Sequence, residues 1–280
     1  MNRPVLRYHG GKFRLAPWIL EFFPPHQIYV EPFGGAAGVL IQKPRSHGEV
    51  YNDLDGDIVN LFRVLRSPEQ RQLLLEQLVL TPYARAEFDL AYEDSTDPVE
   101  RARRTCIRAT MGFGSAGATK GKTGFRLDCQ RKYATAQQLW ASYPDGLSDI
   151  GSRLAGVLIE NRDALDCMRD HDTPDTLHYV DPPYVLDTRS TGGNRYYRHE
   201  MTDADHRTLL AGILDLTGMV VVSGYAHPIY DEMLASWETH STSSRISAGR
   251  GTATRTETVW LNPACSRALH AQGLFEECTT

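Results

Sequence analysis

The stretch Leu177–Tyr184, with the sequence LHYVDPPY, joins a short apolar run to an acid followed by two prolines. The run is rich in residues that favour strands, so we predict a β-strand that ends at Asp181. A residue before proline is pushed out of the helical region, and each proline fixes φ and lacks an N–H donor. The chain therefore leaves the strand extended and stiff, with the Asp181 carboxylate and the Pro182 carbonyl as two acceptors.

Two acceptors beside an aromatic ring suit an exocyclic amino group on a planar base. Such a group has two hydrogens to donate, and Tyr184 offers a flat face for stacking. The amine is a weak nucleophile because its lone pair is delocalised into the ring, as at N6 of adenine. Acceptors that favour its pyramidal form stabilise the transition state more than the ground state. A proline-rich turn without a chemical role would also produce these four residues.

Outward from this stretch, other short runs rich in Val, Ile or Tyr predict further strands, namely Gln27–Glu31, Glu49–Asn52, Val157–Asn161, Met219–Ser223 and Thr258–Leu261. Apolar residues at helical spacing lie between them, at Gly38–Lys43, Asp57–Leu65, Asp203–Leu214 and His227–Ala235. Strands that alternate with helices predict an α/β fold with a largely parallel sheet. Ligands of such a sheet bind beyond the carboxyl ends of its strands.

The middle of the chain has a different pattern. Helical periodicity dominates residues 67–152, for example in Glu69–Leu80 and Tyr83–Tyr92. The glycine-rich segment 111–125 interrupts it and is predicted as a loop between helices. We therefore expect a discontinuous α/β domain, residues 1–66 and 153–280, split by a mainly helical insertion, residues 67–152.

Charge is concentrated in that insertion. The whole chain has a net charge of −5, but residues 101–133 contain nine Lys or Arg and a single acid, Asp128. This asymmetry suggests a local surface for a polyanion on an otherwise acidic body, although a solvated helix face would have the same composition.

Composition excludes several classes of protein. The apolar content of 41% and charged content of 23% are typical of a globular chain. No apolar run approaches the roughly 20 residues that span a bilayer, and the first residues, MNRPVLRYHGGK, lack the apolar core of a secretory signal. Five scattered cysteines without a CxxC pair suggest neither a disulfide framework nor a zinc site. We expect a cytoplasmic protein that has no metal and does not associate with membranes.

Three further motifs have the composition of a nucleotide site. The stretch Val30–Gly38 (VEPFGGAAG) follows a predicted strand, and its small residues allow close approach of a ligand. Asp53 ends the next strand, about 20 residues on, where an acid can accept from ribose hydroxyls or cap a helix. The opening Arg7–Lys12 (RYHGGK) combines two glycines with a lysine that could meet a carboxylate.

Together these motifs resemble the Dam-type, D12 class of N6-adenine DNA methyltransferases. That family has an aromatic-x-Gly-Gly-Lys opening, a Phe-x-Gly turn, an acidic strand end and Asp-Pro-Pro-Tyr in the same order. The resemblance extends to Ser223–Tyr225 and Glu257–Pro263, and covers nearly the whole chain. It implies a Rossmann-like class I methyltransferase sheet that uses S-adenosyl-L-methionine, with the insertion as target-recognition domain. It also implies base flipping in double-stranded DNA.

The resemblance implies roles for individual residues. The catalytic set is Asp181, Pro182 and Tyr184. The cofactor set is Tyr8, Lys12, Phe33, Gly35, Asp53, Asp163 and Asp181, with Lys12 near the methionine carboxylate and Asp163 near the cofactor adenine. For DNA contacts we nominate Arg108, Lys120, Lys122, Arg126 and Arg195. The basic stretches 189–198 and 245–255 are further candidates for DNA contact. We expect the protein to act as a monomer.

Two departures from the family pattern matter. The Phe-x-Gly-x-Gly turn is Phe33-Gly34-Gly35-Ala36-Ala37 here, and alanine is small enough to preserve the turn. The loop Met111–Gly117 lacks the Asn-Gly-x-x-Arg of GATC-methylating members, so GATC is not predicted as the target.

Alternatives remain open at this stage. The same chemistry could serve N4 of cytosine or an amine on RNA, and product nucleoside analysis would distinguish these. A DNA-binding protein that keeps the fold without catalysis would bind cofactor without methyl transfer. A nicotinamide-dependent enzyme is disfavoured because the glycine turn is not GxGxxG. The recognition sequence and the existence of a cognate endonuclease are not predicted.

Overall fold

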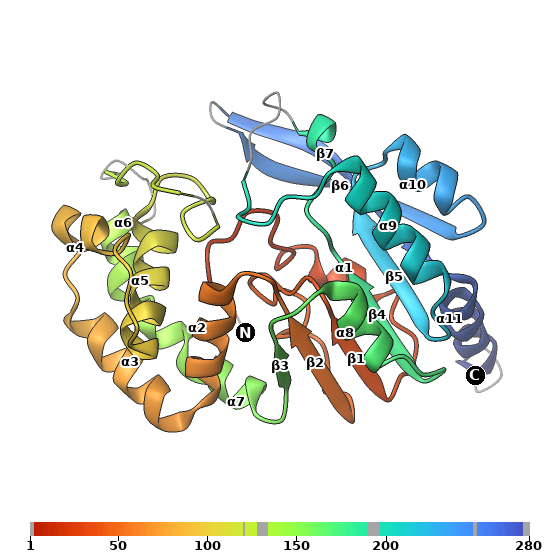
Figure 1. The fold of residues 1–280 in the computed structure, drawn as a ribbon, viewed down its shortest axis with the longest axis horizontal. Coiled ribbons are helices and arrows are strands. Elements are labelled where there is room, and N and C mark those ends of the chain that lie inside the picture. Colours follow the sequence, from red (N-terminus) through yellow and green to blue (C-terminus); the bar gives the residue numbers. More distant parts are fainter. Residues whose placement is uncertain (1–2, 120, 128–133, 190–195, 249–250, 277–280) are drawn as a thin grey trace.

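The computed structural model describes residues 3–119, 121–127, 134–189, 196–248 and 251–276. Its centre is a seven-stranded sheet with the order β3-β2-β1-β4-β5-β7-β6 (Figure 1). The strands are β1 (Ile28–Glu31), β2 (Gly48–Asn52), β3 (Leu158–Glu160), β4 (Thr176–Val180), β5 (Met219–Gly224), β6 (Glu238–Ala248) and β7 (Gly251–Leu261). Strands β1 to β5 pair in parallel, and β7 runs antiparallel to both β5 and β6. The prediction of an α/β fold with a largely parallel sheet is confirmed.

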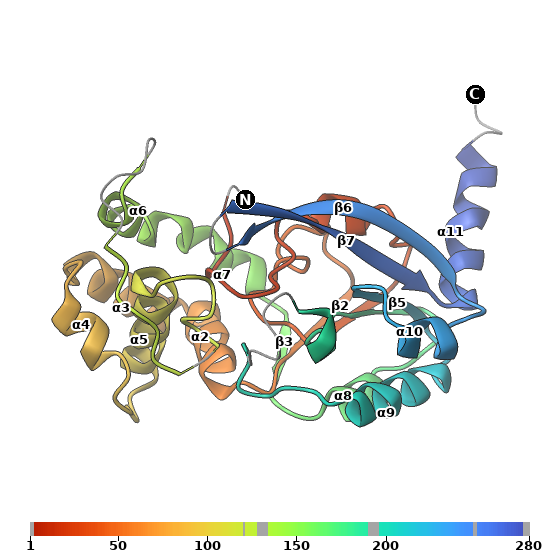
Figure 2. The same cartoon turned by 90° about the horizontal axis from the view of Figure 1, so that it is seen from above.

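Helices cover both faces of the sheet. Helices α8 (Ala164–Asp170), α9 (Asp203–Leu214) and α10 (Pro228–Met233) lie on one face, and α1 (Ala16–Leu20) and α11 (Pro263–Glu276) lie on the other (Figures 1 and 2). Sheet strands are buried on both sides, as all five residues of β4 and all six of β5 show. This burial explains why both strands are continuous apolar runs.

Between β2 and β3 the described chain forms helices to one side of the sheet (Figure 1). They are α2 (Gly56–Arg66), α3 (Pro68–Leu80), α4 (Arg85–Leu90), α5 (Pro98–Met111), α6 (Ala136–Ala141) and α7 (Ser148–Leu154), with a 3₁₀ turn at Pro144–Gly146. Local sequence determines their starts: Ser67 and Asp97 accept hydrogen bonds as N-caps, and each is followed by a proline at the first helical position. The glycine-rich segment after α5 is a loop whose ends are joined by a bridge between Gly112 and Phe125.

One predicted helix was wrong. Residues 38–43 form consecutive turns, with hydrogen bonds from Ile41 to Ala37 and from Lys43 to Val39, instead of a regular helix. Gly35 and Ala37 just before them have positive φ, so a right-handed helix could begin only after Ala37. The backbone therefore curls around the end of β1 as a compact turn.

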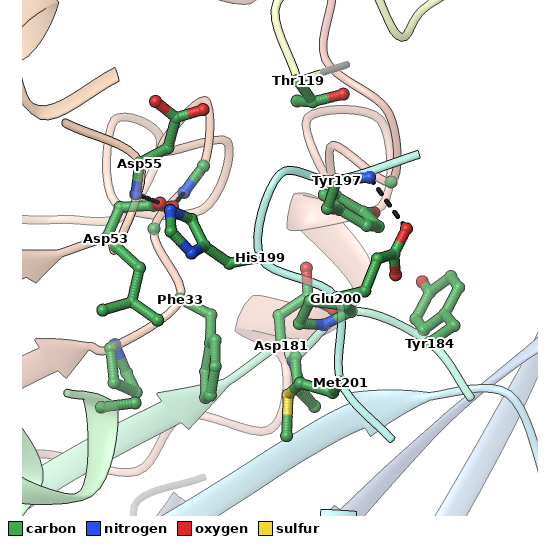
Figure 3. A pocket seen from close by; sticks show the side chains of 18 of the residues that line it. Phe33, Asp53, Asp55, Thr119, Asp181, Tyr184, Tyr197, His199, Glu200 and Met201 are labelled. Carbon is green, nitrogen blue, oxygen red and sulfur yellow. Dashed lines mark hydrogen bonds between the residues drawn. The ribbon is translucent and has the colours of Figure 1, made fainter. Parts of the chain in front are cut away.

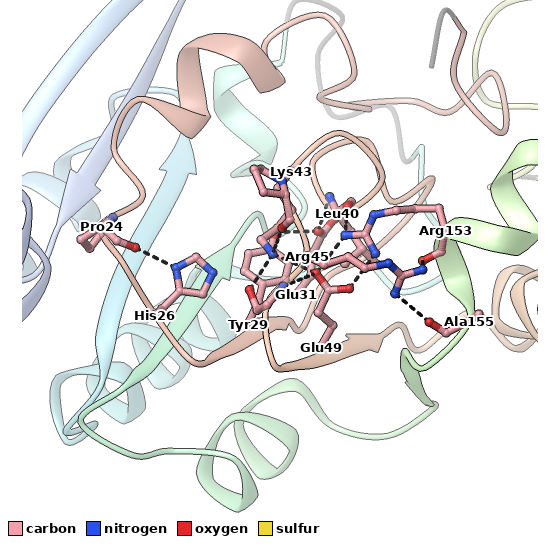
Figure 4. A network of polar contacts seen from close by, with 12 residues as sticks. Pro24, His26, Tyr29, Glu31, Leu40, Lys43, Arg45, Glu49, Arg153 and Ala155 are labelled. Carbon is pink, nitrogen blue, oxygen red and sulfur yellow. Dashed lines mark hydrogen bonds and ion pairs between the residues drawn. The ribbon is translucent and has the colours of Figure 1, made fainter.

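A buried polar network joins α7 to the sheet (Figure 4). Arg153 of α7 donates to both carboxylate oxygens of Glu49 at 2.6 and 2.9 Å and to the Leu40 carbonyl at 2.6 Å. Lys43 also pairs with Glu49, at 2.9 Å. Arg45 donates to the carbonyls of residues 152, 153 and 155 at the end of α7. These contacts hold the helical segment against the loop that leads into β2.

In the part of the chain that the structure describes, no helix is both long and apolar enough to cross a membrane.

Candidate active site

A cavity of about 650 Å³ opens at the carboxyl ends of β1, β2 and β4 (Figure 3). Its lining includes most of the residues singled out from the sequence, namely Tyr8, Lys12, Phe33, Gly35, Asp53, Asp163, Asp181, Pro182 and Tyr184. These residues come from five separate segments of the chain. The position agrees with the rule that ligands of open α/β sheets bind beyond the carboxyl strand ends, where the strand order reverses.

The turn after β1 forms one wall of this cavity. Gly35 has a φ of 47°, and a Cβ there would lie 2.8 Å from the Tyr8 ring. A Cβ on Gly34 would lie 2.1 Å from the Tyr51 ring. Both positions therefore need glycine, one for its backbone conformation and both for space. The aromatic rings of Tyr8 and Tyr51 pack directly on the turn and support it from behind.

Asp53 supports the same turn from β2. Its carboxylate accepts hydrogen bonds from the backbone N–H groups of Gly35 at 2.8 Å and Asp55 at 2.7 Å. Burial raises the pKa of Asp53 to about 6, and these two hydrogen bonds oppose the rise. Each oxygen retains a lone pair that can accept from a ligand hydroxyl.

Asp163 lines the cavity at the start of α8, after the neighbouring strand β3. Its carboxylate accepts from the N–H groups of Leu165 at 2.9 Å and Asp166 at 3.2 Å, which makes it the N-cap of the helix. Leu165 lines the cavity beside it and adds an apolar surface.

Asp181 is the acid that ends β4, and Lys12 neutralises it. The Lys12 ammonium donates to the two Asp181 oxygens at 2.7 and 2.9 Å, and the Ser223 hydroxyl donates to Asp181 Oδ1 at 2.9 Å. Burial raises the pKa of Asp181, and Lys12 offsets only part of that rise. Burial alone would lower the pKa of Lys12, but Asp181 and Glu257 raise it above its ordinary value. The ammonium and the carboxylate therefore stabilise each other's charged form inside the protein.

Tyr184 is held by a second acid. Its hydroxyl donates to Glu257 Oε1 of β7 at 2.6 Å, and its ring centroid lies 4.2 Å from that of Tyr225. Glu257 is 2% exposed, and burial raises its pKa. The Lys12 ammonium lies 4.6 Å from the Tyr184 ring centroid and 3.5 Å from Glu257. Tyr184, Asp181, Lys12 and Glu257 thus form one contiguous cluster.

The segment 196–201 forms the roof of the cavity. Tyr197 donates its hydroxyl to the His9 carbonyl at 3.1 Å, and Tyr196 stacks on His9 with centroids 4.0 Å apart. Glu200 accepts from both tyrosine N–H groups and pairs with Arg189 at 2.8 Å. Figure 3 shows Glu200 between Tyr197 and Tyr184 and shows His199 on the side of Asp53. The roof is therefore built by residues that follow the catalytic stretch in sequence.

A comparison with known families identifies the family of this chain. A model of the D12 class N6 adenine-specific DNA methyltransferases matches residues 8–242, which include every residue that lines the cavity. The chain belongs to this family.

Three known proteins are similar to this D12 methyltransferase, each over a different share of its length. The DNA adenine methylase of Haemophilus influenzae is 26% identical over 74% of this chain and 73% of its own. The DNA adenine methylase of Serratia marcescens is 23% identical over 89% of this chain and 92% of its own. The DNA N-6-adenine-methyltransferase of Escherichia phage P1 is 21% identical over 76% of this chain but only 28% of its own. The resemblance stated from the sequence motifs is therefore confirmed, and with it the reaction class of an adenine-specific DNA methyltransferase using a methyl donor of the S-adenosylmethionine type.

The nominated DNA-contacting residues of this methyltransferase differ in their surroundings. Lys122 is 58% exposed and pairs with Asp89 at 2.6 Å. Arg126 is 5% exposed, and its backbone bonds with Met111 and Tyr83 close the loop after α5. Lys120 and Arg195 lie outside the described residues.

Arg108 requires a correction. Its side chain is 8% exposed and donates to Asp57 at 2.8 Å and to the Ala91 carbonyl at 2.9 Å. A guanidinium enclosed in this way cannot reach a phosphate or a base edge, so the prediction that Arg108 contacts DNA was wrong. The reason is that Asp57 at the start of α2 draws Arg108 inward, and also pairs with Arg101 and Arg198.

Several site residues carry no role that the sequence alone assigns. Glu31 and Glu257 are buried acids within apolar strands. Ser223, in β5, and Tyr225, directly after β5, also join the cluster. A single acid inside a run such as TETVWL is the available signal, because a buried charge needs a partner. The identity of that partner requires the three-dimensional fold.

Proposed function

We propose that this chain transfers a methyl group from S-adenosylmethionine to N6 of an adenine flipped out of double-stranded DNA. The observation that carries the proposal is a shared cavity: the glycine turn after β1 and Asp181 after β4 line it together from neighbouring strands. A donor and an acceptor react when their atoms are held about 3 to 3.5 Å apart and aligned. Adjacent sites within one cavity support that arrangement.

The lining fits the chemistry of the donor. S-adenosylmethionine supplies an electrophilic methyl group on a positively charged sulfur. The cavity offers carboxylates to such a cation, from Asp53, Asp163 and Asp181, and apolar surface from Phe33 and Leu165. We assign Asp53 to the ribose hydroxyls and Asp163 to the vicinity of the adenine ring. Tyr8, Phe33 and Gly35 form the walls.

The end of β4 receives the target base. Asp181 and the Pro182 carbonyl accept from the two N6 hydrogens, and the Tyr184 ring stacks on the base. Extracting the base from the duplex costs a few kcal/mol, of which stacking on an aromatic ring offsets roughly 1 to 3 kcal/mol. Asp181 also has a pKa raised by burial, so it can take the proton that N6 loses after methylation.

We infer that residues 67–152 recognise the DNA. The exposed Lys122 lies on the loop after α5, and the neighbouring Thr119 donates to the Tyr196 carbonyl of the roof at 2.5 Å. This loop therefore reaches the edge of the cavity into which the base must enter. Lysines there contact phosphates and make DNA affinity fall with salt.

The test is methylation of DNA that lacks methylated adenine, with S-adenosylmethionine as donor and single-molecule sequencing plus nucleoside mass spectrometry as readouts. We expect N6-methyladenine within a defined motif. N4-methylcytosine as the product would replace the proposed base, and methylation of RNA alone would replace the proposed polymer.

The variant Asp181→Ala tests the assigned chemistry. We expect methyl transfer to fall by at least about a thousandfold, since the main acceptor for N6 is lost. Binding of S-adenosylmethionine, measured by calorimetry, should remain detectable. Asp187→Ala is the matched control, because Asp187 lies six residues further on and its side chain is 70% exposed. Full activity of Asp181→Ala would overturn the assignment.

A further inference from the structure

The Lys12 ammonium occupies the position that the proposed function gives to the target amino group. It donates to both Asp181 oxygens, at 2.7 and 2.9 Å, where N6 of the base must donate. It also lies 4.6 Å from the Tyr184 ring centroid, over the surface on which the base must stack. A base cannot use both surfaces while the ammonium remains there, so Lys12 must move when the base enters.

A second carboxylate is available for the displaced ammonium. Glu257 Oε1 lies 3.5 Å from Lys12 Nζ and accepts the Tyr184 hydroxyl at 2.6 Å. The Tyr184 hydroxyl is at the edge of the ring, so a shift of Lys12 toward Glu257 moves the ammonium from the ring face to that edge. The Lys12 side chain is 4% exposed and the Glu257 side chain 3%. Both ends of this shift therefore lie within the protein.

We propose that Glu257 is a positioning residue that takes over the Lys12 ammonium when the target adenine enters, an inference that rests on the proposed function. In the enzyme without DNA, the Lys12 ammonium takes the place of the amino group against Asp181. On base entry the ammonium exchanges Asp181 for Glu257, and Ser223 remains bonded to Asp181 Oδ1. Asp181 then faces the base without a competing cation.

Electrostatics explains why the exchange needs Glu257. A buried ammonium that loses its carboxylate is strongly destabilised, because neither water nor another charge compensates it. With Glu257 at 3.5 Å, the ammonium stays paired throughout. An Asp181 carboxylate relieved of the ammonium is also a stronger hydrogen-bond acceptor, which favours the pyramidal amine at the moment of reaction.

The variants Glu257→Gln and Lys12→Met/Glu257→Gln test this inference. Glutamine can still accept the Tyr184 hydroxyl but cannot neutralise Lys12. We expect kcat of Glu257→Gln to fall about tenfold, with the affinity for S-adenosylmethionine within about twofold of wild type. Removing the ammonium as well should raise kcat at least about threefold above that of Glu257→Gln alone. Glu238→Gln, four register positions away on β6 of the same hairpin, is the matched control.

A spectroscopic measurement follows base entry directly. The probe is a DNA duplex that contains the target motif found in the methylation experiment, with 2-aminopurine in place of the target adenine. Its fluorescence should rise less with Glu257→Gln than with wild type and should recover in the double variant. A purely structural Glu257 would leave Glu257→Gln unchanged or make the double variant worse than the single one, and either result would overturn the inference.

Failure of the proposed function gives a different result. If wild type methylates no adenine, the reaction assignment fails before Glu257 is tested. If wild type methylates adenine and Glu257→Gln keeps the wild-type kcat, the reaction stands and the role of Glu257 falls.

Discussion

Glu31 is the last residue of β1, and it is buried inside the protein with 3% of its surface exposed. It accepts hydrogen bonds from the Tyr29 hydroxyl at 2.7 Å and the Leu40 N–H at 3.0 Å, and it lines the proposed donor site. Burial raises its pKa to about 8, against those hydrogen bonds. The neutral acid is therefore the stable form in the folded enzyme without ligand, although the same group in the unfolded chain ionises near pH 4.5.

This pKa predicts a pH-dependent effect of Glu31→Gln. The folded state binds the Glu31 proton more tightly than the unfolded chain does. The contribution of Glu31 to stability is therefore complete below about pH 4.5 and declines as pH rises through about 8. Glutamine stays neutral and keeps both acceptor contacts. We expect the melting temperature of Glu31→Gln, relative to wild type, to rise by at least about 3 °C between pH 5 and pH 9. Glu232→Gln, at an exposed site, should show no such trend, and a flat difference for Glu31→Gln would refute the prediction.

Sequence alone predicts the residues whose chemistry is visible in a motif. Asp181, Tyr184, Asp53 and the Gly35 turn all line the cavity because each follows a strand. Arg108 was misassigned since composition cannot reveal that Asp57 draws its side chain inward. The role of Glu257 was not predicted, because its partners Lys12 and Tyr184 are more than seventy residues away in sequence. Contacts of that range depend on the fold.

At the scale of elements, short buried strands are easier to predict than paired polar ones. Strand β6 contains the run THSTSS, which lacks the apolar pattern of a strand, and it exists as a long hairpin partner of β7. Residues 38–43 show the opposite error, because their apolar spacing is helical although the chain there forms turns that follow the positive φ of Gly35 and Ala37. In both places a neighbouring segment overrides the local preference.

The turn after β1 predicts a difference between two glycine variants. Gly35→Ala combines a φ of 47° with a contact of 2.8 Å to the Tyr8 ring, whereas Gly156→Ala has a φ of 83° and open space. We expect Gly156→Ala to cost about 1 kcal/mol of unfolding free energy and to bind S-adenosylmethionine normally. Gly35→Ala should cost more and weaken that binding at least about tenfold. Denaturation and calorimetry would measure both, and equal effects of the two variants would contradict the role of the turn.

At the scale of the whole molecule, an acidic body carries a basic loop beside its cavity. We predict that Lys122→Glu lowers DNA affinity and reduces the slope of log affinity against log salt by about one, because one phosphate contact is lost. Arg169→Glu makes the same change of charge in the last turn of α8, which lies toward the opposite end of the sheet. Filter binding over a salt series would measure both variants. If wild type and Lys122→Glu have equal slopes of log affinity against log salt, the DNA does not bind at the loop that carries Lys122.

The anchoring of α7 by Arg153 and Arg45 has a consequence for the ancestry of this enzyme. The helical segment leaves after β2 and returns at β3, so both of its attachments lie at one margin of the sheet, away from the boundary between donor and base. If that segment recognises DNA, a related enzyme's segment could be exchanged for it by recombination without disturbing the chemistry. Such an exchange should keep the Arg153–Glu49 pair, so the second junction of the exchanged segment should fall before Arg153. New target sequences could then arise by swapping one module while the catalytic half is inherited intact.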